Sequence, residues 1–278
     1  MKFSTKLLSA SAVAALAMLA VAAPSQAAVF ADFNPIVVDA NGHPVLDTHG
    51  NYQKSAVDDY SWANAGGAAN NSKNGSFSTL TSKGAIGSLL VEFSFSDPAL
   101  SQDGTDLLAN FTASMSETGF AAIPPGGPGQ TWLQQGLTNG VSAFSFTLAN
   151  ATVINGHSYA AGTNLLSGTL SDAWIQGAGG TGSTNVTIGN GGSLHFTSAV
   201  EPFTGLIPGS QEFVLDLGSV HPHFGAHTGD ALESFKANGG GNFSFLAVPE
   251  PATWGLMLVG FGGMGAMLRR RRATAVAA

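Results

Sequence analysis

The chain has 278 residues, a formal net charge of −7 and no cysteine. The lack of cysteine excludes disulfides, thiol catalysis, Cys-zinc sites and iron–sulfur clusters, so packing alone must stabilise the fold. Between residues 28 and 248 the chain holds only four lysines and no arginine, but sixteen of its 17 acidic residues. We expect no nucleic-acid partner for such an acidic body, because phosphate binding needs basic contacts.

The first 27 residues have the pattern of a secretory signal peptide. Lys2 and Lys6 form a basic start, and residues 7–23 are apolar or small. Pro24 and Ser25 then lead to a small-x-small cleavage site ending at Ala27. We expect export and cleavage after Ala27, with Ala28 as the second choice, and an uncleaved anchor as the alternative.

Residues 28–74 are polar and lack a clear period, which predicts an irregular N-terminal arm. Asp58 and Asp59 stand beside Tyr60 and Trp62 in this stretch. Such a polar and aromatic group would suit a sugar-binding surface. Aromatic side chains buried beside an edge strand would explain it equally well.

Residues 75–247 show apolar residues at every second position, separated by Gly-rich turns. This period of two is typical of half-buried strands. The predicted strands are 89–96, 107–115, 141–149, 165–176, 184–188, 193–199, 211–217, 232–237 and 242–247. Residues 131–137 could form a short helix at most, and the Pro/Gly run 124–129 marks a possible internal boundary. The pattern predicts an all-β ectodomain, an antiparallel sandwich or jelly-roll-like fold.

Two groups of side chains in this body could bind metal ions. His221, His223, His227 and Asp230 offer three imidazoles and a carboxylate, which zinc, copper or nickel would accept. An exposed polar loop is the plainer interpretation, because the spacing matches no known motif and Pro222 limits convergence. Asp103 to Asp106 could offer oxygens to calcium, but four residues cannot supply six ligands, and an Asx-type turn accounts for them.

No catalytic motif stands out along the chain. Neither a Gly-x-Ser-x-Gly elbow, a His-Glu-x-x-His pair nor a phosphate-binding loop occurs. We therefore expect a protein that is not an enzyme and that needs no cofactor.

The chain ends with three features in a fixed order. Pro249, Glu250 and Pro251 form a stiff, extended segment, because each proline fixes its own φ and disfavours helix before it. An uncharged run from Trp254 to residue 268 follows, about 22 Å long as a helix at ~1.5 Å per residue. Counted from Pro251, the helix would be about 27 Å long. It would then only just span a bilayer core of about 30 Å, with Trp254 at the outer interface. The arginines Arg269, Arg270, Arg271 and Arg272 favour a cytoplasmic C-terminus.

This arrangement over residues 248–272 resembles the PEP-CTERM sorting signal of Gram-negative bacteria. The resemblance implies processing near residues 248–251 by exosortase, a membrane-embedded cysteine protease or transpeptidase. It also implies that the four arginines stop translocation, and that the short tail 273–278 is cytoplasmic. Family members often accompany exopolysaccharide and biofilm formation.

The sequence thus predicts a protein anchored by one C-terminal transmembrane helix in the inner membrane, N-out and C-in, and then delivered to the cell surface or matrix. A structural or adhesive role in exopolysaccharide or biofilm is the first expectation. A carbohydrate-binding module without catalysis is the alternative, and a secreted hydrolase is a third. The expected partners are the exosortase, the membrane and an extracellular polysaccharide.

Overall fold

The computed structural model describes residues 28–96, 106–119, 121, 132–137, 142–179, 186–190, 194–200 and 211–245. Their regular structure is strand, apart from one 3-10 turn, η2 (Gly67–Ala69). The strands are β1 (Ala28–Pro35), β2 (Tyr60–Asn64), β3 (Asn74–Thr79), β4 (Leu89–Phe95), β5 (Leu107–Thr118), β6 (Trp132–Gly136), β7 (Ser142–Leu148), β8 (Thr152–Ile154), β9 (His157–Tyr159), β10 (Asn164–Leu170), β11 (Ala173–Ala178), β12 (Val186–Asn190), β13 (Leu194–Thr197), β14 (Gln211–His221) and β15 (Phe235–Phe245).

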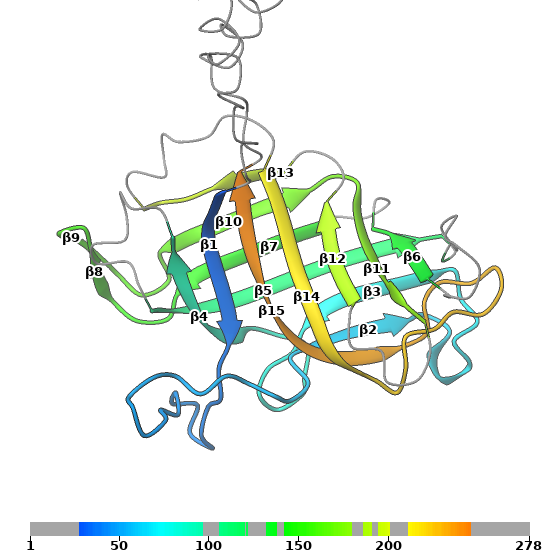
Figure 1. The fold of residues 1–278 in the computed structure, drawn as a ribbon, viewed down its shortest axis with the longest axis horizontal. Coiled ribbons are helices and arrows are strands. Elements are labelled where there is room, and N and C mark those ends of the chain that lie inside the picture. Colours follow the sequence, from blue (N-terminus) through cyan, green and yellow to red (C-terminus); the bar gives the residue numbers. More distant parts are fainter. Residues whose placement is uncertain are drawn as a thin grey trace, which may run out of the picture. The chain divides into compact units, whose positions relative to one another are not determined.

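The body is an antiparallel sandwich, as the sequence predicts. One layer has the order β13-β10-β7-β5 and the other the order β15-β14-β12-β11-β6. In Figure 1, β1, β15 and β14 cross in front of β7 and β5. Rings of the two layers meet between them: the centroids of Phe144 (β7) and Phe213 (β14) are 5.5 Å apart, and those of Phe146 (β7) and Phe243 (β15) are 5.8 Å apart.

Four short strands join the two layers by hydrogen bonds. β1 pairs with β15 and β4, and β4 pairs with β5. β2 pairs with β15 and β3, and β3 pairs with β5. Because β5 has 12 residues and β15 has 11, each offers one edge to two successive partners. The layers therefore belong to one continuous 13-stranded sheet.

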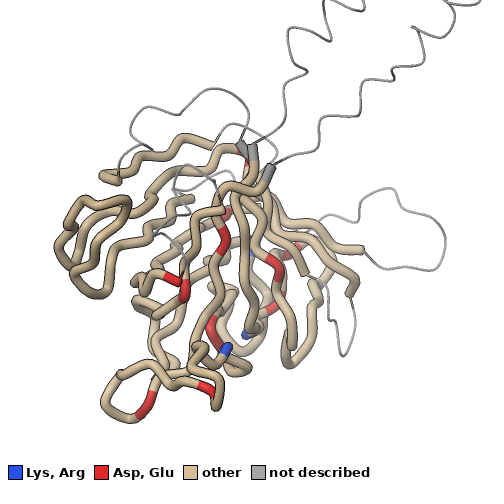
Figure 2. Tube along the Cα trace, turned by 60° about the vertical axis from the view of Figure 1, so that its left-hand side comes forward, with Lys and Arg blue, Asp and Glu red and all other residues tan. Residues whose placement is uncertain are grey.

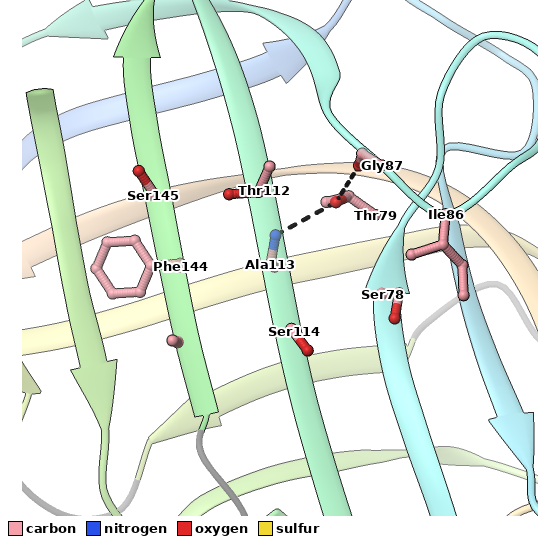
Figure 3. A pocket seen from close by; sticks show the side chains of 10 residues that line it. Ser78, Thr79, Ile86, Gly87, Thr112, Ala113, Ser114, Phe144 and Ser145 are labelled. Carbon is pink, nitrogen blue, oxygen red and sulfur yellow. Dashed lines mark hydrogen bonds between the residues drawn. The ribbon is translucent and has the colours of Figure 1, made fainter. Parts of the chain in front are cut away.

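A threonine fills the point where β5 changes partner. β5 pairs with β4 over Leu107 to Phe111 and with β3 from Ser114 onward. In the gap, the Ala113 N–H donates to Thr79 Oγ1 over 3.3 Å, and the Thr79 hydroxyl donates to the Gly87 carbonyl over 2.7 Å (Figure 3). The Thr79 side chain thus satisfies a backbone donor at a point where β5 pairs with neither β3 nor β4.

Phenylalanine and leucine are the commonest residues of the core among the described residues. Phe33 of β1 lies 4.9 Å from Phe111 of β5 and 4.8 Å from Phe146 of β7, and Phe111 and Phe146 stack at 4.3 Å, all measured between ring centroids. All three side chains are fully buried. Phe111 and Phe146 stand at inward positions of β5 and β7, where the period of two was visible in the sequence.

The predicted irregular arm over 28–74 is wrong where β1 and β2 lie. β1 is inserted between β15 and β4, and its residues Phe30 and Phe33 are 2% and 0% exposed. β2 joins β15 to β3, with Trp62 1% exposed. Residues 36–59 and 65–73 lack extended strands, and the first of these segments has an order of its own, described below.

Three further element predictions need correction. The single strand predicted over 165–176 is two strands, β10 and β11, because Asp172 turns the chain with φ of 51°. The two strands predicted over 232–237 and 242–247 are one strand, β15. The short helix considered for 131–137 is strand β6, which pairs with β11.

The glycines of β15 mark a bend in the strand. A Cβ on Gly241 would lie 2.6 Å from the Phe33 ring, and one on Gly240 would lie 2.8 Å from the Phe33 carbonyl oxygen. β15 curves here as it passes from β1 to β2, as the orange strand in Figure 1 shows. The sequence suggested a break because glycine usually interrupts a strand.

Residues 28–246 form one compact unit. Among the described residues, no helix is long and apolar enough to cross a membrane. The predicted signal peptide, transmembrane helix and internal boundary at 124–129 lie outside the described residues.

Candidate ligand-binding groove

The segment between β1 and β2 contains a repeat of eight residues that was not predicted from the sequence. Residues 37–44 read VVDANGHP and residues 45–52 read VLDTHGNY, with Val, Asp and Gly at equivalent positions. Each copy folds into a tight hairpin, with bridges between Val38 and Pro44 and between Leu46 and Tyr52. We call residues 36–55 the hairpin module.

Three backbone hydrogen bonds close the hairpin module into a triangle. The Val37 N–H donates to the Gln53 carbonyl over 2.8 Å, the Val45 N–H donates to Val37 over 2.9 Å, and the Gln53 N–H donates to Val45 over 2.9 Å. These residues are eight positions apart. The bridge between Ile36 and Lys54, where the chain enters and leaves, completes the third side.

Each hairpin tip is held by an aspartate and a glycine. Asp39 Oδ1 accepts from the N–H groups of Asn41 and His43, and Asp47 Oδ1 accepts from the equivalent His49 and Asn51. The His43 and Asn51 backbone donors are the main reason why the pKa values of the two aspartates are lowered. Gly42 and Gly50 both have φ of +86°, a conformation that glycine adopts without strain.

A groove lies between the hairpin module and the sheet. Its cavity has a volume of about 390 Å³. A second cavity of about 320 Å³ adjoins it, and Val38, Gly42 and Ser82 line both. The module, the loop after β3, the start of β4 and the middle of β5 supply its walls. Lys83 and Asp39 line the second cavity.

Asp59 is the one buried polar side chain among the described residues that line the larger cavity. It is 3% exposed, because the module covers the outer face of the sheet at the start of β2. The Ser55 hydroxyl donates to its Oδ1 over 2.8 Å. Its Oδ2 is buried without a hydrogen-bond partner. A buried carboxylate oxygen in this state is costly, because it has lost water and gained nothing in exchange.

Electrostatics explain the state of Asp59. Its pKa is raised to about 6, mainly by burial. The neighbouring Asp58 carboxylate contributes to the rise, and the Ser55 hydrogen bond opposes it. The neighbouring Asp58 has basic partners of its own. His221 Nε2 lies 3.0 Å and Lys236 Nζ lies 3.2 Å from the Asp58 carboxylate. Figure 2 shows the wider setting, with many acidic and few basic positions on the body.

The histidines predicted as metal ligands contact two different carboxylates. His221 contacts Asp58, whereas His223 Nε2 lies 2.7 Å and His227 Nε2 3.6 Å from the carboxylate of Glu233. Asp230 donates its backbone N–H to the His227 carbonyl. Among the described residues, no three His, Cys, Asp or Glu side chains are arranged to hold a metal ion. Metal binding by this loop stays a prediction from the sequence, and Glu233 is the contact that sequence reasoning missed.

Tyr60 and Trp62 do not form a sugar-binding surface. Tyr60 is 0% and Trp62 1% exposed, and the Trp62 indole N–H donates to the Leu232 carbonyl over 2.9 Å. Burial beside the strand is therefore the correct interpretation of these rings. Asp106 ends the other acidic group from the sequence, whose residues 103–105 lie outside the described residues.

The surface has two further features, a hollow over the sheet and a carboxylate with a raised pKa. A shallow hollow of about 300 Å³ lies over β3, β5 and β7, lined by Ser78, Thr112 and Ser145 (Figure 3). On the outer face of β4, burial and a hydrogen bond with Asp106 raise the pKa of Glu92, and Lys54 opposes that rise. Neither feature contains a buried polar atom without a partner.

The predicted sorting residues Pro249, Glu250, Pro251, Trp254 and Arg269 to Arg272, and the cleavage residue Ala27, lie outside the described residues. Residues 247–272 match the family model of the PEP-CTERM protein-sorting motif. The resemblance suspected from the sequence is thereby confirmed. The chain matches no curated protein and no solved structure. The motif implies an exported protein that an exosortase-type enzyme sorts to the cell surface.

Proposed function

We propose that this protein is a surface or matrix component of the cell envelope. Its signal peptide exports it, and its C-terminal helix holds it in the inner membrane with the body outside and the arginines inside. An exosortase-type enzyme then cuts near residues 248–251 and releases or transfers the body. The match of residues 247–272 to the sorting motif is the observation that carries this proposal.

The role proposed for the body is structural or adhesive, within exopolysaccharide or biofilm, and not catalytic. Its acidic, Gly- and Ser-rich surface favours a soluble extracellular protein. The hydrolase alternative predicts release of product from glycans or esters, lost on a single substitution. The structural role predicts loss of biofilm cohesion in a deletion strain, without such release.

The first experiment measures the intact mass of the protein in a host with an exosortase and in the same host without it. We expect a mass ending near residues 248–251 only in the first host. Pro249→Ala should restore the full tail, because the extended segment would lose its fixed geometry. A mass that keeps the arginines in both hosts would leave a plain tail anchor and overturn the sorting proposal.

A further inference from the structure

The groove beside the hairpin module is built to receive a ligand. Its larger cavity falls within the range of about 300–1,000 Å³ that is usual for small-molecule sites. Apolar side chains of Val37, Val57 and Leu89 share its lining with the polar groups of Ser88 and Asn110. Val57 is 64% exposed, so an apolar surface reaches the rim. A mainly apolar cleft with a few polar groups is the usual form of a binding site.

The state of Asp59 indicates which hydrogen-bonding group a ligand needs in this groove. Its Oδ2 accepts no hydrogen bond within the protein. At neutral pH, above its pKa of about 6, Asp59 is ionised and can only accept. The ligand must therefore supply a donor. A bound metal ion is a poor candidate, because calcium needs six to eight oxygens and Asp59 is the single carboxylate among the described residues that line this cavity.

The other lining groups favour hydroxyl donors on an amphipathic ring. Ser55, Ser82, Ser88 and Asn110 can both donate and accept, which matches hydroxyl groups that do the same. The apolar side chains can pack against the C–H face of a sugar ring. The adjoining second cavity gives room for a neighbouring unit of a chain.

We propose that this groove binds a sugar unit of a hydroxyl-rich polysaccharide, with the Asp59 carboxylate accepting a hydrogen bond from a ring hydroxyl. The proposed matrix role supplies the source of that polysaccharide, but binding itself does not depend on sorting. The sugar contacts the walls formed by the hairpin module and by β4 and β5. Because no aromatic ring stands among the described residues that line the groove, affinity per unit is low and grows with chain length.

The test uses the full chain, purified in mild detergent, with neutral tetrasaccharides of glucose, mannose, galactose and N-acetylglucosamine as probes. Saturation-transfer NMR detects binding, and titration calorimetry measures the dissociation constant. We expect at least one probe to bind. Asp59→Asn should then raise the dissociation constant about tenfold or more, because the amide presents a donor where the hydroxyl needs an acceptor.

Asp58→Asn is the matched control. It removes the same charge one residue away, but Asp58 contacts His221 and Lys236 and does not line the groove. We expect its affinity to equal that of the original protein. Asn110→Ala is a second groove variant for use if Asp59→Asn fails to fold, and it should also weaken binding. Failure of every probe to bind, or equal binding by the groove variants, would overturn the proposal. The mass measurement of the tail is independent, so either proposal can fail alone.

Discussion

At the scale of the residue, Asp59 is a buried side chain whose ionisation is less favourable in the folded protein than in the unfolded chain. The pKa of this carboxylate is raised because burial, with one oxygen left without a hydrogen bond, disfavours the ionised form. Its pKa in the folded protein is about 6, whereas the ordinary value is 3.8. The folded protein therefore holds this proton more tightly than the unfolded chain does.

This difference predicts how stability depends on pH. Asp59 stabilises the fold fully below its unfolded pKa, and that contribution is lost as the pH rises from about 4 through about 6. Urea unfolding at several pH values should show the original protein losing stability relative to Asp59→Asn over this range. The comparison cancels the other carboxylates, which both proteins share. A constant difference at every pH would contradict the assigned pKa.

At the scale of the element, the glycines of β15 are positions where a Cβ would collide with neighbouring strands. Gly239 has φ of +153°, and a Cβ there would collide with the Asp216 carbonyl oxygen of β14. Strand β14 cannot move away, because its other edge pairs with β12. The bend that lets β15 serve both β1 and β2 thus depends on backbone without side chains.

Gly239→Ala should therefore lower the free energy of unfolding by about 3 kcal/mol or more. Gly84→Ala is the control, because Gly84 also has a positive φ, +74°, but faces open space. It should cost only about 1 kcal/mol, from backbone strain alone. Equal losses in urea unfolding would mean that β14 and β15 can separate without cost.

At the scale of the whole molecule, the ring cluster holds the two layers together. Phe146 of β7 contacts Phe33, Phe93 and Phe111, and it also reaches Phe243 in the opposite layer. Without cysteine, this packing and the shared strands are what stabilise the sandwich. Loss of one central ring removes contacts on both sides at once.

Phe146→Ala should destabilise the body by about 3–5 kcal/mol, the usual cost of a large cavity in a core. Ile86→Ala offers a contrast on the surface, since Ile86 is 73% exposed and should change stability by less than about 0.5 kcal/mol. Thermal unfolding of both variants measures the difference. Similar midpoints for the two would show that the layers do not depend on this cluster.

The sequence predicted those strands whose inward positions carry large apolar residues. β4, β5 and β7 place apolar residues at alternate positions, with Leu, Val, Phe or Met among them, and their predicted limits are close to those observed. β1 and β2 were missed because polar residues and Pro35 dilute their alternation. β10 and β11 were merged because the two-residue turn between them contains no glycine.

The groove could be predicted only in part. Asp59 was noted in the sequence, but beside the wrong partners, because Tyr60 and Trp62 point into the core. The hairpin module had a readable signal, the eight-residue spacing of Val, Asp and Gly over residues 37–52. What no pattern gives is the packing of that module over β2, which depends on contacts distant in sequence. The sorting motif, a continuous local signal, was readable in full.

The pairing of Ala28 with Phe245 has a mechanical consequence. The body begins and ends at the same point, so a tether attached after β15 pulls at one end of β1, while the hairpin module follows the other end of β1. Tension between a held tail and a ligand gripped beside the module would run along β1, β14 and β15. Their ladders would be loaded in shear, with many hydrogen bonds bearing force together instead of opening one after another.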